Sequence, residues 1–223
     1  MKKVFLILIL FLSCYFIYNK TIDNKLYYIT IGDSLSKGTN EYGVVSYGYN
    51  DYIKDYLKNN NFLKEYNKTF TDDDYQVADI VRIIEYNENK NNYSLNRLIK
   101  KADIITISLG MNELYYKLDK NNENFYTYID NMIKNYSKLL DYINNFHHYK
   151  VFILGYYNIL GNSNDIFEYA NHKLKEICNK NNYIYIDLSK IFNNNPNYFS
   201  KLDSFIPNIR GYEKISQIIV ENL

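Results

Sequence analysis

A serine follows an apolar run near the start of the chain, within Gly32-Asp33-Ser34-Leu35. Ligands of open parallel sheets collect at the carboxyl ends of the strands. A strand that ends at Gly32 therefore presents the Ser34 hydroxyl on a turn between a strand and a helix. Serine hydroxyls become nucleophiles when a neighbouring base accepts their proton. The sequence predicts a reactive or ligand-binding site at Ser34.

A second polar side chain follows a later apolar run, within Gly110-Met111-Asn112-Glu113. An asparagine at this position can direct its side-chain amide at an oxyanion that forms over the sheet edge. The alternative is an asparagine that caps the next helix. The presence of Ser34 after another strand favours the oxyanion role.

Three motifs of this chain resemble sequence blocks of the SGNH/GDSL hydrolases, namely Gly32-Asp33-Ser34-Leu35, Gly110-x-Asn112 and Asp203-x-x-Ile206-Pro207-Asn208-x-x-Gly211-Tyr212. The resemblance spans residues 26–223. It implies a flavodoxin-like three-layer α/β/α sandwich and hydrolysis of a small-molecule, glycan or lipid ester, with no metal and no cofactor.

The resemblance also implies a role for each matched residue. Ser34 would be the nucleophile, and its backbone amide would share the oxyanion hole with Asn112. Asp203 would orient a catalytic histidine. The remaining motif residues, placed at the rim of the site, are Asp33, Gly110, Glu113 and Ile206.

Ile206 stands where the family pattern has histidine, and no histidine follows His172. Isoleucine can neither accept the proton of Ser34 nor return it to the leaving group. Loss of one member of a catalytic triad costs on the order of 10⁴ to 10⁶ in kcat. Catalytic competence is therefore in doubt, and the alternative is a degenerate domain that binds an acyl or glycan ligand, or a partner protein, without turnover.

A second departure concerns the oxyanion hole. Aligned through Ala78-Asp79-Ile80, the position of a family glycine holds Asp74. A backbone amide survives the change, but a carboxylate beside a developing oxyanion raises the barrier through like-charge repulsion. The aspartates at 72–74 are interpreted as a solvated loop, an altered oxyanion site or a cation site.

Another group can replace the missing base only if it lies close to Ser34. His147 and His148 precede a strand, so we expect them at the opposite end of the sheet. His172 falls on the polar face of a helix. Glu113 and Asp74 are the nearer alternatives, because a desolvated carboxylate can act as a base.

The elements that must position these residues alternate between short apolar runs and segments of helical period, which is typical of a parallel sheet covered by helices. Five strands are predicted, at 26–31, 64–69, 103–109, 150–155 and 183–187. Helices are predicted at 47–59, 76–87, 93–101, 123–146, 165–180 and 209–221. The helix at 123–146 carries one apolar stripe that faces the sheet.

The N-terminal segment has the layout of a signal peptide or membrane anchor, because the uncharged run from Val4 to Tyr18 follows Lys2 and Lys3. We expect residues 1–24 to form an uncleaved hydrophobic helix with a short linker, and residues 25–223 to form one extracytoplasmic domain. Lipid attachment at Cys14 and ordinary secretion are the alternatives.

Composition excludes some classes of partner. The formal net charge is +1, with 26 basic and 25 acidic residues spread along the chain, so nucleic acid is not expected as a partner. Of the two cysteines, Cys178 falls on the apolar side of a helix and is expected to be a buried thiol. We expect a monomer whose membrane contact is made by the N-terminal segment.

Overall fold

The structure is a computed structural model, and it describes residues 25–119, 124–159, 164–193, 195–200 and 205–223. A five-stranded sheet with all neighbours parallel forms its centre. The order across the sheet is β2 (Leu63–Asn67), β1 (Leu26–Gly32), β5 (Ile104–Ser108), β6 (Lys150–Leu154) and β7 (Ile184–Ile186). This is the 2-1-3-4-5 strand order of flavodoxin-like folds.

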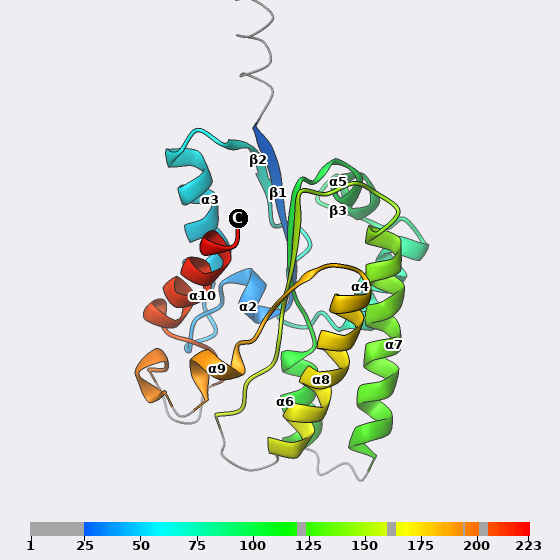
Figure 1. The fold of residues 1–223 in the computed structure, drawn as a ribbon, viewed down its shortest axis with the longest axis vertical. Coiled ribbons are helices and arrows are strands. Elements are labelled where there is room, and N and C mark those ends of the chain that lie inside the picture. Colours follow the sequence, from blue (N-terminus) through cyan, green and yellow to red (C-terminus); the bar gives the residue numbers. More distant parts are fainter. Residues whose placement is uncertain (1–24, 120–123, 160–163, 194, 201–204) are drawn as a thin grey trace, which may run out of the picture.

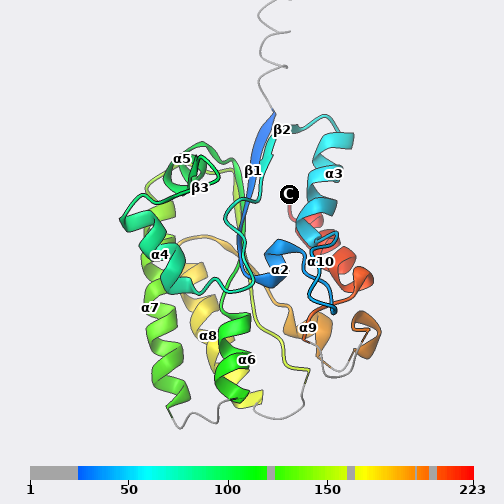
Figure 2. The same cartoon turned by 180° about the vertical axis from the view of Figure 1, so that it is seen from behind.

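Helices cover both faces of the sheet (Figure 1). One face carries α3 (Tyr49–Asn59) and α10 (Ile209–Glu221), which pack against each other. The other carries α4 (Val77–Glu85), α7 (Phe125–Ile143) and α8 (Asn164–Lys180), and Figure 2 shows the same layers from behind. The predicted three-layer α/β/α sandwich with five parallel strands is confirmed. The N-terminal hydrophobic helix lies outside the described residues.

The core follows from the apolar runs of the sequence. Every residue of β5 is buried, as is the second half of β1, because helices cover both faces of these central strands. The apolar stripe of α7 is buried as expected, with Ile129, Met132, Ile133, Tyr136, Leu139, Leu140 and Ile143 facing inward. Cys178 is also fully buried, and burial raises the pKa of its thiol to about 12.

The segment before α5 differs from the prediction. A helix was expected over 93–101, but α5 spans Leu95–Lys101 and follows a small antiparallel hairpin of β3 (Asn89–Lys90) and β4 (Tyr93–Ser94). Asn91 and Asn92 form its turn with φ values of 50° and 65°. Two consecutive residues with positive φ favour a tight hairpin turn, and asparagine tolerates that conformation.

Four shorter elements complete the fold: α2 (Ser34–Lys37), α6 (Met111–Asp119), α9 (Ser189–Phe192) and the 3₁₀ turn η1 (Pro196–Tyr198). None of them was predicted from the sequence. Two of them, α2 and α6, start directly after β1 and β5 and carry the polar residues of the candidate site. Within the described ranges, no helix is both long and apolar enough to cross a membrane.

Candidate active site

The Ser34 hydroxyl lies at the point where the strand order reverses, between β1 and β5. Ser34 is the first residue of α2 and is 4% exposed. The turn before it depends on Gly32, because a Cβ there would lie 2.0 Å from the Ser108 carbonyl oxygen and 2.4 Å from Ser36 Oγ. The chain therefore packs closely enough to fix Ser34 over the edge of the sheet.

Asn112 is the direct hydrogen-bond partner of Ser34. Ser34 Oγ donates to Asn112 Oδ1 over 2.9 Å, and Asn112 Nδ2 donates to the Asp73 carbonyl oxygen over 2.7 Å. A carbonyl oxygen only accepts, so this second bond fixes the orientation of the amide and turns Oδ1 toward Ser34. One N–H of Asn112 remains for an oxyanion. An amide oxygen is too weak a base to remove the serine proton, so the hydroxyl rests in an unactivated state.

The loop at 71–75 is held against the site by two lysines. Asp73 accepts from Lys37 Nζ and Thr39 Oγ1, both over 2.5 Å. Asp72 accepts from Lys90 Nζ over 2.9 Å, and this hydrogen bond lowers the pKa of Asp72. Asp74 is exposed and lies one residue beyond the carbonyl that binds Asn112. Among the described residues, no group of three or more His, Cys, Asp or Glu side chains is arranged to hold a metal ion.

A shallow apolar pocket lies beside the serine. Its lining is formed by Ser34, Leu35, Met111, Tyr157, Phe205, Ile206, Pro207 and Tyr212. Ile206 thus shares a pocket with Ser34, at the position where the sequence motif requires a histidine. Asp203, expected to orient that histidine, lies outside the described residues.

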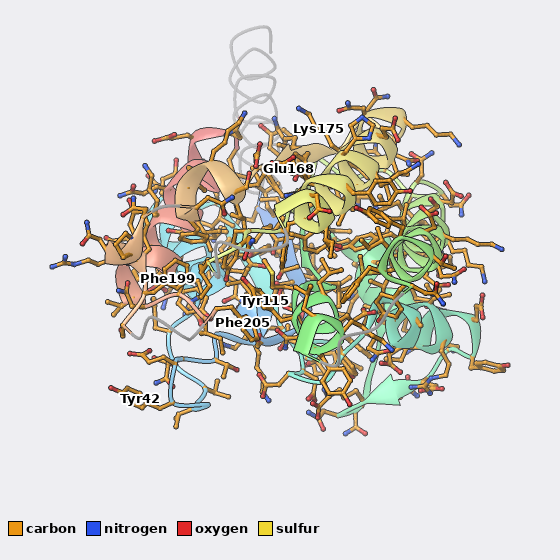
Figure 3. The ribbon with its side chains drawn as sticks, turned by 90° about the horizontal axis from the view of Figure 1, so that it is seen from below. Tyr42, Tyr115, Glu168, Lys175, Phe199 and Phe205 are labelled. Carbon is orange, nitrogen blue, oxygen red and sulfur yellow. The ribbon has the colours of Figure 1, made fainter. Side chains whose placement is uncertain are left out.

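Aromatic contacts fix the segment that carries Ile206. The Phe205 ring stacks on Tyr115 with centroids 4.4 Å apart, and Tyr157 Oη donates to the Phe205 carbonyl oxygen over 2.5 Å. Figure 3 shows Phe205 and Tyr115 next to each other at this end of the molecule. Phe205, the residue before Ile206, is therefore held by both its ring and its backbone. Sequence reasoning missed Tyr157, although it follows β6 and the rule used for Ser34 and Asn112 also applies to it.

The three histidines lie away from Ser34. The ring nitrogens of His148 contact the carbonyl oxygens of Ala102 and Ile143 at 2.6 and 3.2 Å, which places this residue at the amino end of the sheet. His147 beside it is exposed, and the side chain of His172 on α8 is 70% exposed, 3.8 Å from Glu176. None of them reaches the hydroxyl.

Glu113 and Asp33 do not lie at the rim, where the sequence analysis placed them. Glu113 is 7% exposed and accepts from Val77 N at 2.7 Å and from Tyr128 Oη at 2.6 Å. It therefore binds the first residue of α4, whose N–H has no partner within the helix. Burial raises the pKa of its carboxyl. Because both oxygens accept hydrogen bonds, Glu113 has a structural task and is a poor substitute base.

Asp33 lies beneath the site and is completely buried. Its Oδ1 accepts from Leu35 N at 3.3 Å and from Ser108 Oγ at 3.2 Å, so it caps α2 and joins β1 to β5. Burial raises the pKa of this carboxyl to about 7. Gly110, the other predicted rim residue, makes the turn from β5 into α6 with a φ of 94°, and a Cβ there would lie 2.8 Å from Tyr156 Oη.

These features define an α/β/α protein in which Ser34 is hydrogen-bonded to Asn112 at the carboxyl edge of the sheet and adjoins a shallow apolar pocket lined by Ile206. The model of the GDSL-like lipase/acylhydrolase family matches residues 28–219. The chain belongs to this family, which confirms the resemblance inferred from the motifs. Membership supports action on ester substrates.

Solved structures share the fold. The lipase Lip_vut3 from a goat rumen metagenome is 24% identical, with a TM-score of 0.72 over 88% of this chain and 97% of that one. The acetylxylan esterase Axe2 from Geobacillus stearothermophilus is 16% identical, with a TM-score of 0.68 over 90% and 94%. Serine, aspartate and histidine variants of Axe2 are described as catalytic mutants. No match was found among curated proteins.

Proposed function

We propose that this chain is a slow serine ester hydrolase of the cell envelope that acts on short O-acyl esters. The observation that carries the proposal is the pairing of the Ser34 hydroxyl with Asn112 beside a shallow apolar pocket. A pocket this shallow does not enclose a long acyl chain, so the proposal is for short acyl groups. The proposed location follows from the uncharged run at Val4–Tyr18, with an uncleaved anchor as the first choice and lipid attachment at Cys14 as the second.

In the proposed reaction Ser34 Oγ attacks the ester carbonyl carbon. The backbone N–H of Ser34 and the remaining N–H of Asn112 stabilise the oxyanion. The intermediate collapses, and the leaving alkoxide takes a proton from solvent and departs as the alcohol. Water then hydrolyses the acyl-serine to the free acid and restores the Ser34 hydroxyl. The serine proton passes to solvent because Ile206 cannot accept it, and both steps are therefore slow.

A second candidate is a binding domain that recognises an acyl ester without turning it over. Two features favour it: Ile206 lines the pocket, and Asn112 presents its oxygen to Ser34. An abandoned site, however, gives no physical reason to keep a serine on a tight turn that only glycine permits.

Hydrolysis of p-nitrophenyl acetate by the full-length chain in detergent distinguishes the two candidates. The slow-hydrolase proposal expects turnover above the buffer rate that Ser34→Ala removes. The Ser34→Ala protein has the same pocket and lacks only the hydroxyl, so it is the matched control. Equal rates for the two proteins would reject hydrolysis at Ser34 and favour the binding domain.

A further inference from the structure

The amino ends of the central strands form a lysine-rich surface on the side of the molecule opposite Ser34. We call it the amino-edge surface and define it by five exposed lysines: Lys25, Lys58, Lys64, Lys100 and Lys101. Lys25 directly precedes β1, and Lys64 lies at the start of β2. Lys58 and Lys100 lie in the last turns of α3 and α5, which end at this edge in Figures 1 and 2.

Contacts with the Tyr27 ring bring two of these lysines together. The ammonium groups of Lys64 and Lys101 lie 5.1 and 5.5 Å from the centre of the Tyr27 ring. Leu26 N donates to the Phe62 carbonyl oxygen over 2.6 Å, which joins the starts of β1 and β2. Phe62 is 48% exposed among the lysines. Basic side chains around an exposed aromatic ring suit the interface of an anionic membrane.

Acidic residues also lie at this edge. The carboxylate of Asp103 accepts from Tyr27 N over 2.8 Å and is half-buried. Glu65 is exposed on β2. Asp141 and Glu221 are exposed in the last turns of α7 and α10, whose ends contact His148 and Tyr149 just before β6. The excess of lysines therefore lies in the part of the edge formed by β1, β2 and α5.

Chain geometry limits how far this surface can lie from the N-terminal apolar run. That run ends at Tyr18, and residues 19–24 connect it to Lys25. Six residues span at most about 20 Å. The seven residues of β1 then carry the chain about 20 Å in the other direction, to the edge where Ser34 lies.

We propose that the amino-edge surface docks on the anionic surface of a phospholipid bilayer, so that the Ser34 pocket opens away from the lipid. The proposal rests on the proposed envelope location but not on catalysis. It selects the substrate class: an ester at Ser34 lies at least about 20 Å above the bilayer, the length of β1. Acyl groups on a glycan or another extended polymer meet this condition, whereas the esters of bilayer lipids do not.

The orientation of the domain on the bilayer can be tested by fluorescence quenching in the full-length chain. A fluorescent probe is attached to one cysteine, and spin-labelled lipid in the vesicle is the quencher. A nitrobenzoxadiazole probe is attached at Phe62→Cys or, as the comparison, at Tyr42→Cys, which is 69% exposed at the pocket end (Figure 3). Cys14→Ser removes the other reactive thiol, because Cys178 is buried. The vesicles contain headgroup spin-labelled lipid in phosphatidylcholine, with or without phosphatidylglycerol.

We expect strong quenching at Phe62→Cys only in vesicles with phosphatidylglycerol, and none at Tyr42→Cys. Replacing Lys58, Lys100 and Lys101 by Gln should lower the ratio of docked to undocked protein about a hundredfold, at about fivefold per lysine. The matched control replaces three exposed lysines on α7, α8 and α9 by Gln, namely Lys134, Lys175 and Lys190, and should leave the ratio unchanged.

Quenching at Tyr42→Cys would overturn the proposal, since the pocket would then face the lipid. Equal quenching at Phe62→Cys in both vesicle types, or no quenching in either, would also overturn it. Full-length protein that fails to sediment with either type of vesicle would reject the envelope location together with the docking. Sedimentation without quenching would reject the docking alone.

Discussion

Substituting Ile206 by histidine should convert the slow site into an efficient one. Ile206 lines the same pocket as Ser34, and the segment around it is held by the stacking of Phe205 on Tyr115 at 4.4 Å. An imidazole at position 206 would therefore lie in a well-held segment that lines the same pocket as the Ser34 hydroxyl. Asp203 lies three residues earlier in the sequence, at the spacing that the family motif uses to orient the imidazole.

The size of the gain follows from the role of the base. General-base catalysis contributes about 10²–10⁴ in rate, and we expect Ile206→His to raise kcat/KM for p-nitrophenyl acetate by that factor. The lower bound corresponds to about 2.7 kcal/mol in the activation free energy. The gain should appear as pH rises through about 6.5, because only the neutral imidazole accepts a proton.

Two control variants show whether a gain in rate comes from an imidazole that acts on Ser34. Ile206→Leu keeps an apolar side chain of the same size and should leave the rate at the wild-type value. Ile206→His combined with Ser34→Ala should show no gain, because the base then has no hydroxyl to activate. If Ile206→His matched Ile206→Leu, the assignment of this position as the base position would be wrong.

Three further predictions concern the framework of the site. Gly32→Ala should destabilise the fold by about 3 kcal/mol or more in urea unfolding, since its Cβ meets the backbone oxygen of Ser108 at 2.0 Å; unchanged stability would show that β1 shifts easily. The Asp33 carboxyl, with its pKa raised from 3.8 to about 7, should make the wild type lose up to about 4 kcal/mol of stability as pH rises from about 4 to about 7. Stability falls with rising pH because the folded state holds a proton that the unfolded state releases. Asp33→Asn should remove this pH dependence of the unfolding free energy. Parallel plots of unfolding free energy against pH for the two proteins would contradict this. Glu113→Ala should cost about 2–4 kcal/mol, because it leaves the buried Val77 N and the half-buried Tyr128 hydroxyl without their acceptor. Glu113→Gln should cost less, and equal unfolding midpoints for the two variants would argue against the cap.

The fold could be predicted from the sequence because its apolar runs are clear. Strands buried on both faces appear as continuous apolar runs, as in Ile104–Ser108, and the stripe of the longest helix repeats at spacings of three and four. The hairpin before α5 was missed because its strands have two residues each, too short for any periodic signal. The adjacent Asn91 and Asn92, which form its turn, were the sequence feature that could have indicated a hairpin.

The sequence predicted those site residues whose place is set by the end of a strand. Ser34 and Asn112 follow strands, and the parallel sheet brings their side chains within 2.9 Å. The tasks of Asp33 and Glu113 depend on which distant backbone amide each carboxylate meets, such as Val77 N, and no local pattern encodes that contact.

Intact-protein mass spectrometry after incubation with p-nitrophenyl acetate tests the central claim most directly. A reactive Ser34 without a base should form an acyl-serine from this activated ester and release it slowly, since water also lacks a base in the second step. We expect a mass gain of one acetyl group that maps to Ser34 and is absent from Ser34→Ala. A wild-type protein without this adduct, or an equal adduct in both proteins, would contradict it.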